Sequence, residues 1–388
     1  MSEAILKQLK EKFISAYGQP PSTVSRAPGR LEILGNHTDY NEGMVLSCAV
    51  SQSIYFAIRP NNLQKCRIFS MGFGENTQEI PIDEISKKIT GDWKNYIKGV
   101  ICEFRKRNCD VKGFDAGIAS DLPLSAGMSS SAAIEVSACM ALEKAFGFNF
   151  SPVERAKIGQ GSENNFVGAR TGLLDQFSSI FGKENSLILC DFRKNEVIGN
   201  VPLPLGHSIV VVNTMIKHDL VDSEYNDRRE SCENVMKEIG KTNPELTTLR
   251  DLSSEMLDSF KSRLAIFDYR KGRHITEENE RVAKAVEFLD KGDIAAFGKL
   301  LFESHKSSRL NFENSCPELD YLVELAQSIP GCLGARLSGG GFGGISIHIV
   351  AENSVPDYVR RIKTAYKLKF KTDPQTIECK AGSGAQLL

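Results

Sequence analysis

The chain has 388 residues, of which 41% are hydrophobic and 25% are charged, and its formal net charge is −1. This length is long for one hydrophobic core and the composition is that of an ordinary globular protein, so two domains are expected. The balanced charge excludes a broad basic surface for nucleic acid or an anionic membrane. No apolar run approaches the roughly 18 residues of a membrane span. The ten cysteines form no C-x-x-C pair, which argues against zinc or a disulfide framework and predicts a reducing, cytoplasmic location.

The hydrophobic pattern predicts a mixture of helices and strands. The first 18 residues carry apolar side chains at helical spacing, without the continuous apolar stretch of a signal peptide. Strands are then expected over residues 46–59 and 65–70, a helix over 93–107, a strand-like segment over 113–123, helices over 130–146 and 151–167, and a strand over 187–192. After VPLP at 201–204 come a strand over 208–214, charged helices over 222–240 and 276–290, a helix near 317–328 and a strand over 345–350. Because these elements do not alternate regularly, they predict an α+β fold, with domains 1–200 and 201–388.

Three loops carry the side chains best suited to chemistry. In the first, residues 29–43, a strand-like start (GRLEIL) is followed by six consecutive hydrogen-bonding side chains (NHTDYN) between Gly35 and Gly43. A surface turn seldom needs that many donors and acceptors, so this loop is a candidate binding loop. In the second, DLPLSAGMSSSAA, a loop of small residues opens directly into a helix. Free N–H groups at a helix start can bind phosphate, although an ordinary serine N-cap would give a similar sequence.

The third loop combines two acidic residues that are twelve positions apart, Glu163 and Asp175. Phosphoryl transfer uses one carboxylate on Mg²⁺ and another near the attacking hydroxyl, and this pair could supply both. The alternative is a helix-terminal charge and a capping Asp. A further segment, GGGFGG within 334–350, precedes a strand rather than opening a helix, so it does not indicate a dinucleotide site.

Taken together, these loops resemble the motifs of the GHMP small-molecule kinases, and within them the galactokinases. APGRLEILGNHTDYNEG is similar to the sugar-binding signature of that family, PLSAGMSSSAA to its ATP loop, GLLDQF to its catalytic-base segment, and the glycine-rich loop to its third motif. The resemblance covers nearly the whole chain. It implies an N-terminal ribosomal-protein-S5-like domain and a C-terminal ferredoxin-like domain.

The resemblance also implies roles for individual residues. Asp175 would contact the anomeric hydroxyl of the sugar, and Arg30 would stabilise the transferring phosphoryl group. Ser131 and Glu163 would hold Mg²⁺. The implied ATP contacts are Ser70, Ser125, Ala126, Gly127, Met128, Ser129, Ser130 and Ser131. The implied sugar contacts are Asn36, His37, Thr38, Asp39, Gly172 and Tyr225.

Asn36 departs from the family pattern, which has Glu at this position to accept a hydrogen bond from the 6-hydroxyl of the sugar. An amide can accept or donate, so the group at C6 stays open. The leading prediction is an ATP- and Mg²⁺-dependent kinase that makes galactose 1-phosphate, for which Asn36→Glu should preserve or improve activity. A kinase for a C6-altered relative such as galacturonate is second, and a non-catalytic galactose and ATP sensor is third. The expected partners are small molecules, and the expected state is a monomer or weak homo-oligomer.

Overall fold

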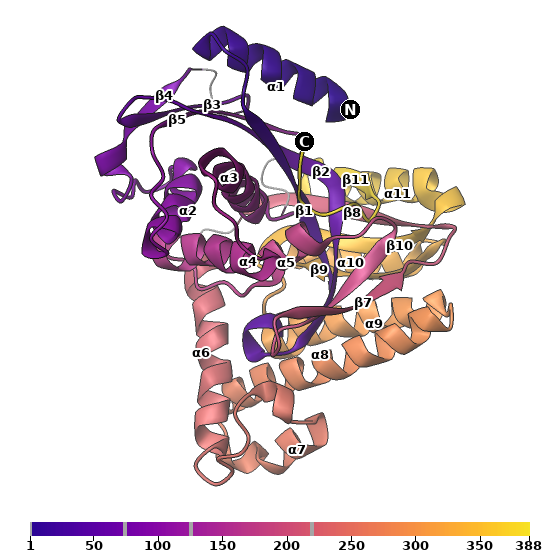
Figure 1. Cartoon of the computed structure of the whole chain (residues 1–388). Coiled ribbons are helices and arrows are strands. Elements are labelled where there is room, and N and C mark those ends of the chain that lie inside the picture. Colours follow the sequence, from indigo (N-terminus) through magenta and orange to yellow (C-terminus); the bar gives the residue numbers. More distant parts are fainter. Residues whose placement is uncertain (1, 73–75, 124–126, 218–220) are drawn as a thin grey trace.

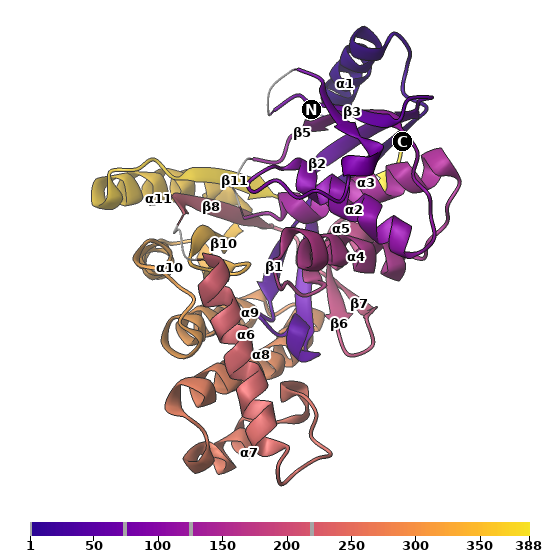
Figure 2. The ribbon, with the colours of Figure 1, turned by 90° about the vertical axis from the view of Figure 1, so that its left-hand side faces the viewer.

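A computed structural model describes residues 2–72, 76–123, 127–217 and 221–388 (Figure 1, Figure 2). Within these ranges the strands form an eight-stranded sheet and a four-stranded sheet, with helices packed against both. The mixture is α+β, as the sequence predicts. None of the helices in the described ranges combines the length and apolar character needed to cross a membrane.

The first sheet has the strand order β12-β1-β2-β5-β3-β4, and β6 and β7 extend it from β2. Its main feature is the long antiparallel pair β1 and β2, which is interrupted by register shifts between Pro28 and Arg30 and between Glu32 and Leu34. Such bulges re-aim side chains and bend strands. The strands are β1 (Thr23–Leu34), β2 (Met44–Pro60), β3 (Lys65–Ser70), β4 (Gln78–Pro81), β5 (Phe114–Ser120), β6 (Ser186–Asp191), β7 (Glu196–Pro202) and β12 (Gln386–Leu387).

Helices cover both faces of this sheet. Alternate residues of β2 point to opposite faces, so Tyr55 packs with α1 while Phe56 packs in the main core. The predicted helix over 151–167 is α4 with a regular capping box at Ser151, followed by a π-helical turn, Ser162–Val167. The helices are α1 (Ser2–Tyr17), α2 (Lys94–Lys106), α3 (Ser130–Phe146), α4 (Pro152–Gly161) and α5 (Leu174–Phe181).

The second sheet has the order β11-β8-β10-β9 and is wholly antiparallel. The charged helix expected over 276–290 begins ten residues earlier, and the sequence reading did not identify α9 or α11. The strands are β8 (His207–Lys217), β9 (Cys332–Ser338), β10 (Gly343–Ala351) and β11 (Gln375–Cys379). The helices are α6 (Val221–Ile239), α7 (Ser254–Ser259), α8 (Ile266–Asp290), α9 (Ile294–Ser307), α10 (Pro317–Ser328) and α11 (Val355–Phe370).

The two sheets meet around β1. One continuous hydrophobic cluster contains Leu31 and Ile33 of β1 together with Ile345 and Ile347 of β10. A boundary at residue 200 would cut β7 two residues before its end, whereas the connection between the two sheets is residues 203–206, between β7 and β8. We keep a boundary near residue 200 as a proposal. The terminal strand β12 returns to pair with β1. This arrangement places one polar face of β1 between the two halves of the chain.

Candidate active site

The predicted catalytic residues form a direct ion pair. Arg30 lies on β1, and its Nε donates to Asp175 Oδ1 in the first turn of α5, with a separation of 2.7 Å. Arg30 Nη1 also donates to the carbonyl oxygen of Gly127, at 3.0 Å. The other oxygen of Asp175, Oδ2, accepts a hydrogen bond from Ser129 Oγ. The pair is therefore joined to the serine loop from both sides.

Beside this pair is a small cavity of about 200 Å³, to which several distant segments contribute. Four of the six predicted sugar contacts line it, and so do both predicted catalytic residues. The lining residues are Arg30, Glu32, His37, Asp39, Thr171, Gly172, Leu174, Asp175, Tyr225, Gly339 and Gly340. The loop after β1, the start of α5, helix α6 and the glycine-rich loop thus meet at one polar cavity.

His37 is held as a neutral ring in the wall of this cavity. It adopts a left-handed backbone conformation (φ 60°), and its ring nitrogens lie 2.9 Å from the hydroxyl of Tyr40 and 3.2 Å from the carbonyl oxygen of Gly340. Burial lowers the pKa of His37 to about 3. Its ring centroid lies 5.0 Å from that of Tyr225. His37 therefore forms part of the cavity wall and carries no positive charge at neutral pH.

Asp39 is a partly buried carboxylate in a negatively charged environment. Its pKa is raised to about 7, first by the loss of solvent around it and then by the nearby carboxylates of Glu32 and Asp175. Gly172 packs directly against Asp39, because a Cβ on Gly172 would lie only 1.7 Å from Asp39 Oδ2. The glycine is thus required for the close approach of this loop to the carboxylate.

Two predicted sugar contacts, Asn36 and Thr38, do not line the cavity, and this corrects the sequence expectation. Asn36 is fully buried, and its amide nitrogen donates to Glu32 Oε1 at 2.8 Å and to the carbonyl oxygen of Gly339 at 2.9 Å. Thr38 Oγ1 donates to carbonyl oxygens of Gly35 and Met44, which closes the turn after β1. Both side chains are therefore used to build the loop.

Glu32 also lines the cavity, although the sequence did not predict it as a site residue. It lies two residues after Arg30 in a regularly paired part of β1, so both side chains share one face of the strand. This alternation could have identified it, but the polar run from Asn36 onward was the stronger signal. A third helix supports the region, because Glu278 Oε1 on α8 accepts hydrogen bonds from the backbone N–H groups of Gly35 and Asn36, each at 3.1 Å.

A second cavity, of about 460 Å³, lies at the start of α3 and is lined by three of the predicted ATP contacts, Ser70, Ser130 and Ser131. The loop enters the helix through left-handed residues, Gly127 (φ 62°) and Ser129 (φ 52°). Ser129 does not cap the helix with its side chain, which instead bonds Asp175. The uncapped helix start suits an anion, in contrast to an ordinary serine N-cap.

The remaining residues of the serine loop divide into two groups. Met128 is buried, and its carbonyl oxygen accepts a hydrogen bond from the backbone N–H of Arg30 at 3.0 Å. Ser125 and Ala126, also predicted to contact ATP, lie outside the described residues. Met128 thus connects the loop to β1 through its main chain.

Glu163, in the π-helical turn after α4, has surroundings that suit a cation. Burial raises its pKa, and the neighbouring Asp175 raises it further. Its carboxylate accepts hydrogen bonds from Thr171 Oγ1, at 2.7 Å, and from Ser131. A carboxylate and a hydroxyl are hard oxygen donors of the kind that Mg²⁺ prefers, and a cation would offset the repulsion between Glu163 and Asp175. The predicted metal-binding residues therefore fit this ion.

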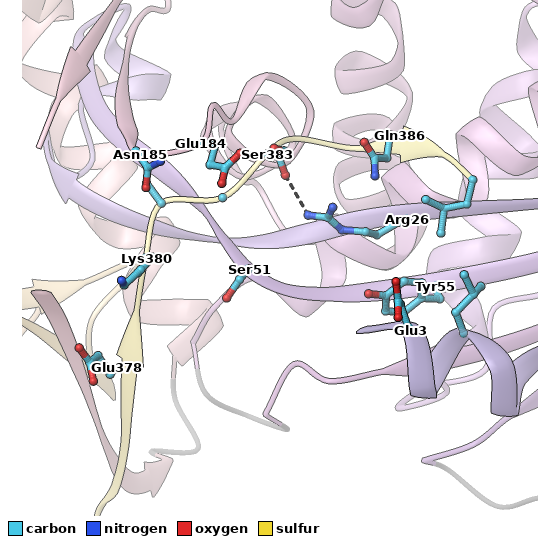
Figure 3. Close-up of a pocket in the computed structure, with 14 residues that line it drawn as sticks. Glu3, Arg26, Ser51, Tyr55, Glu184, Asn185, Glu378, Lys380, Ser383 and Gln386 are labelled. Atoms are coloured by element: carbon cyan, nitrogen blue, oxygen red, sulfur yellow. Dashed lines mark hydrogen bonds between the residues drawn. The ribbon is translucent and has the colours of Figure 1, made fainter. Parts of the chain in front are cut away.

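A larger open cavity, of about 880 Å³, is lined by residues of α1, β2 and the C-terminal segment (Figure 3). Its wall has charges of both signs, including Arg26, Glu184 and Lys380. Arg26 is already used there, because it donates to Ser53 and to the carbonyl oxygen of Ser383. None of the predicted catalytic, sugar or ATP residues lines this cavity, and those that do line a cavity line the two described above.

Comparisons with known proteins agree with this arrangement. Residues 11–60 match the galactokinase galactose-binding signature, and residues 95–183 and 285–368 match the N-terminal and C-terminal domains of GHMP kinases. The chain is 36% identical to a galactokinase of Chloroflexus aurantiacus, over 98% of this chain and 97% of that protein. It is 38% identical to a galactokinase of Thermotoga maritima, over 93% of this chain and 99% of that protein.

Solved structures give the same assignment. Lactococcus lactis galactokinase complexed with galactose superposes with a TM-score of 0.94 at 31% identity, covering 98% of this chain and 99% of that one. Methanococcus jannaschii mevalonate kinase shares the fold, with a TM-score of 0.65 at 18% identity over 93% of this chain and 98% of that one. The predicted α+β GHMP kinase architecture is therefore confirmed. The chain belongs to the galactokinase family of the GHMP kinases.

Proposed function

We propose that this protein transfers the γ-phosphoryl group of ATP to the anomeric hydroxyl of galactose and so forms galactose 1-phosphate. The observation that supports it best is the position of Asp175. Its carboxylate lines the small polar cavity while it is bonded to Arg30 and to Ser129 of the serine loop. A carboxylate placed between a sugar-sized cavity and a phosphate loop can orient a sugar hydroxyl toward ATP.

In the reaction, the anomeric hydroxyl donates a hydrogen bond to Asp175 and attacks the γ-phosphorus. The new O1–P bond forms as the bond to the bridging oxygen of ADP breaks, and the hydroxyl proton passes to Asp175. Arg30, buried beside the reacting atoms, neutralises charge on the phosphoryl oxygens. Mg²⁺, held by Ser131 and Glu163, would supply further charge neutralisation on the ATP phosphates. Orientation and charge stabilisation are the main contributions of the chain itself.

The charges of the cavity favour galactose over galacturonate. Glu32, Asp39 and Asp175 all line it, and Arg30 is already paired with Asp175. A uronate would bring another carboxylate into this buried, negatively charged space, where like charges repel strongly. The Arg30–Asp175 pair and the serine loop also support an enzyme over a sensor that only binds sugar and ATP.

Purified protein should release ADP from ATP with galactose much faster than with galacturonate, N-acetylgalactosamine or glucose, and chelation of Mg²⁺ should stop the reaction. Asp175→Asn should lower kcat by orders of magnitude and leave the fold intact. Asp115→Asn is a matched control, because Asp115 is buried and paired with Arg67 at 2.7 Å on the neighbouring strands β5 and β3. Turnover by Asp175→Asn close to that of the control would contradict the proposed role.

We further propose that the enzyme works in the cytoplasm as a monomer or weak homo-oligomer on small-molecule substrates. All ten cysteines are free thiols, and several of them are buried in the core. Reduced thiols of this kind fit a reducing compartment.

A further inference from the structure

We propose that Glu32 recognises the 6-hydroxyl of the sugar in this chain and that Asn36 acts as the positioning residue that holds Glu32 toward the cavity. This assigns to a residue on β1 the contact that the sequence resemblance placed at Asn36. The inference rests on the proposed function of the cavity. It concerns which side chain selects the substrate, whereas the catalytic step is unchanged.

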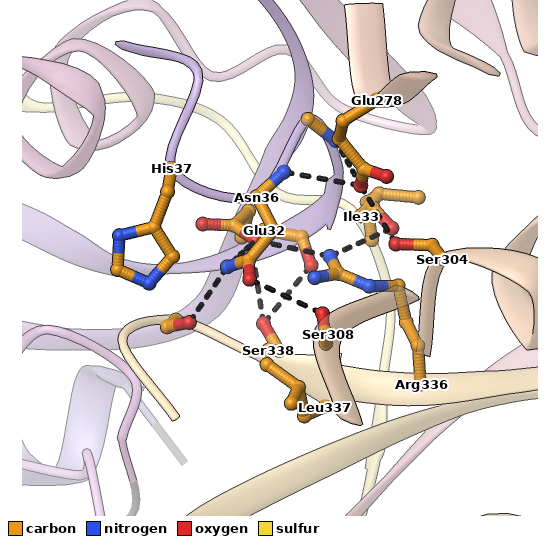
Figure 4. Close-up of polar contacts among 12 residues, drawn as sticks. Glu32, Ile33, Asn36, His37, Glu278, Ser304, Ser308, Arg336, Leu337 and Ser338 are labelled. Atoms are coloured by element: carbon orange, nitrogen blue, oxygen red, sulfur yellow. Dashed lines mark hydrogen bonds and ion pairs between the residues drawn. The ribbon is translucent and has the colours of Figure 1, made fainter. Parts of the chain in front are cut away.

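The first argument is that the two carboxylate oxygens of Glu32 differ in their hydrogen bonds (Figure 4). Oε1 accepts hydrogen bonds from Asn36 Nδ2, at 2.8 Å, and from Arg336 Nη1, at 3.0 Å. No hydrogen bond to Oε2 is found among the described residues, and Oε2 is not one of their fully buried atoms, so this oxygen is accessible from the cavity that Glu32 lines. Glu32 as a whole is only 3% exposed, so this oxygen is free to accept a hydrogen bond from a ligand in the cavity. Glu32 is therefore an acceptor prepared for a ligand hydroxyl.

The second argument is that Asn36 is fixed with its amide nitrogen, and not its amide oxygen, directed at Glu32. Its Oδ1 accepts a hydrogen bond from Asn314 Nδ2 at 3.0 Å, so the amide nitrogen must face Glu32 and Gly339. Its backbone N–H is held by Glu278, 3.1 Å away. Asn36 thus has no free polar atom to offer a sugar, and its function is to orient the Glu32 carboxylate.

The third argument is electrostatic. Arg336 is fully buried, and Glu32 is its ion-pair partner. Burial raises the pKa of Glu32, whereas Arg336 and Arg30 act in the opposite direction and favour the carboxylate. A carboxylate accepts a stronger hydrogen bond from a hydroxyl than a neutral group does, and it repels a second carboxylate. This chemistry selects a hydroxyl or an amine and rejects an acid.

The fourth argument identifies the hydroxyl. Arg30 and Glu32 are two residues apart on one strand, a spacing of about 7 Å, so Glu32 lies roughly one sugar ring away from the end where Asp175 meets the anomeric hydroxyl. Asp39, beside Gly172, brings another carboxylate to the wall of the same cavity. Glu32 has one free oxygen, which suits a single hydroxyl. In a hexopyranose such as galactose, the 6-hydroxyl is the one hydroxyl whose neighbouring carbon carries no hydroxyl, because C5 bears the ring oxygen.

The test compares kcat/KM for galactose, 6-deoxygalactose, 6-amino-6-deoxygalactose and galacturonate. We expect wild-type protein to prefer galactose over 6-deoxygalactose by about 10- to 100-fold, the range of a charge-assisted hydrogen bond. It should also accept the amine and reject the acid. Glu32→Gln should reduce each of these preferences severalfold, mainly through KM. Glu103→Gln is the matched control, because Glu103 on α2 is also a buried carboxylate, paired with Lys106 and with Arg107, which directly follows the helix.

The outcomes separate this inference from the proposed function. Absence of turnover with galactose would contradict the proposed function itself. Turnover of galactose together with equal use of 6-deoxygalactose would overturn only the role of Glu32. A selectivity change in Glu32→Gln that affects a 4-deoxy or 2-deoxy sugar instead would also overturn it. If Glu32→Gln does not fold because Arg336 is left unpaired, the substrate series with wild-type protein can still overturn the inference, through equal use of 6-deoxygalactose or a preference for the acid.

Discussion

Replacing Asn36 by Glu tests the arrangement of the binding loop directly. From the sequence resemblance, this change should preserve or improve the use of galactose. The structure leads to the opposite expectation, because Asn36 is fully buried and donates to Glu32 Oε1 at 2.8 Å and to the carbonyl oxygen of Gly339 at 2.9 Å. A carboxylate at this position can donate to neither group and adds a negative charge next to Glu32.

The expected loss of stability is large. Two buried acceptors lose their donor, at about 1–3 kcal/mol each. Two carboxylates about 4 Å apart repel each other by about 4 kcal/mol at an effective dielectric constant near 20. Asn314 can still donate to the new side chain, which offsets at most one hydrogen bond. A penalty of at least about 4 kcal/mol would remove much of the stability of a typical domain.

The charge gives this penalty a specific pH dependence. Two neighbouring carboxylates can share one proton, so at least one of the pair keeps a raised pKa in the folded state. Between the unfolded pKa and this raised value the folded state binds more protons, so the stability of the variant falls as the pH rises. Chemical denaturation at pH 5 and pH 8 should show a larger penalty at pH 8. Asn36→Gln, which is longer but neutral, should show a penalty that does not depend on pH.

Asn36→Glu protein with wild-type stability and galactose activity at pH 8 would refute the orientation of Asn36 described above. A penalty that is equal at both pH values would refute its electrostatic cause. Either result would also remove the support that Asn36 gives to the role of Glu32.

Three further predictions concern the cavity. Arg30→Ala should lower kcat by roughly 10³-fold or more, as the loss of charge stabilisation in phosphoryl transfer does elsewhere, and near-normal kcat would contradict its role. The pKa of Asp39 is raised from 3.8 to about 7 in the folded state, so the folded protein loses about 4 kcal/mol of stability as the pH rises between these values. Asp39→Asn should therefore be more stable than wild type at pH 8 but not at pH 3, with weaker use of galactose, and an equal difference in stability at both pH values would exclude this cause. Gly172→Ala should raise KM for the sugar at least tenfold, because its Cβ would meet Asp39 at 1.7 Å, whereas Gly199→Ala, with its nearest atom at 3.8 Å, should not.

Much of the fold could be predicted because the spacing of apolar residues directly indicates many of its helices and strands. The strands β2 and β3 and the helices α2, α3 and α10 lie within about two residues of their predicted bounds. Helix α8 was predicted too short because its first turns contain buried polar residues, Lys271 and His274, in place of an apolar stripe. Lys271 is balanced by Glu313 and the carbonyl oxygen of Asn311, more than 30 residues away. Such long-range compensation leaves no periodic signal in the sequence.

The candidate site was predictable as a set of loops but not side chain by side chain. His37, Asp39 and Asp175 line the cavity as expected, whereas Asn36 and Thr38 do not. The reason is the backbone of the turn, where Gly35 (φ 105°) and His37 (φ 60°) are left-handed. Left-handed residues reverse the direction of the chain, so the alternation that orients side chains along β1 no longer applies after Leu34.

The charges of the cavity explain why buried side chains are needed to hold its hydrogen-bond acceptors in place. Glu32, Asp39 and Asp175 bring negative charge into one buried space, and burial raises the pKa of both Glu32 and Asp39. Such a group of acceptors destabilises the empty protein but is complementary to a ligand that consists mostly of hydroxyl donors. A bound sugar would satisfy these oxygens, and binding to the folded state alone stabilises it by mass action. The buried contacts of Asn36, Arg336 and Glu278 hold the acceptors in place until that ligand arrives, so substrate selection in this cavity depends on residues that never touch the sugar.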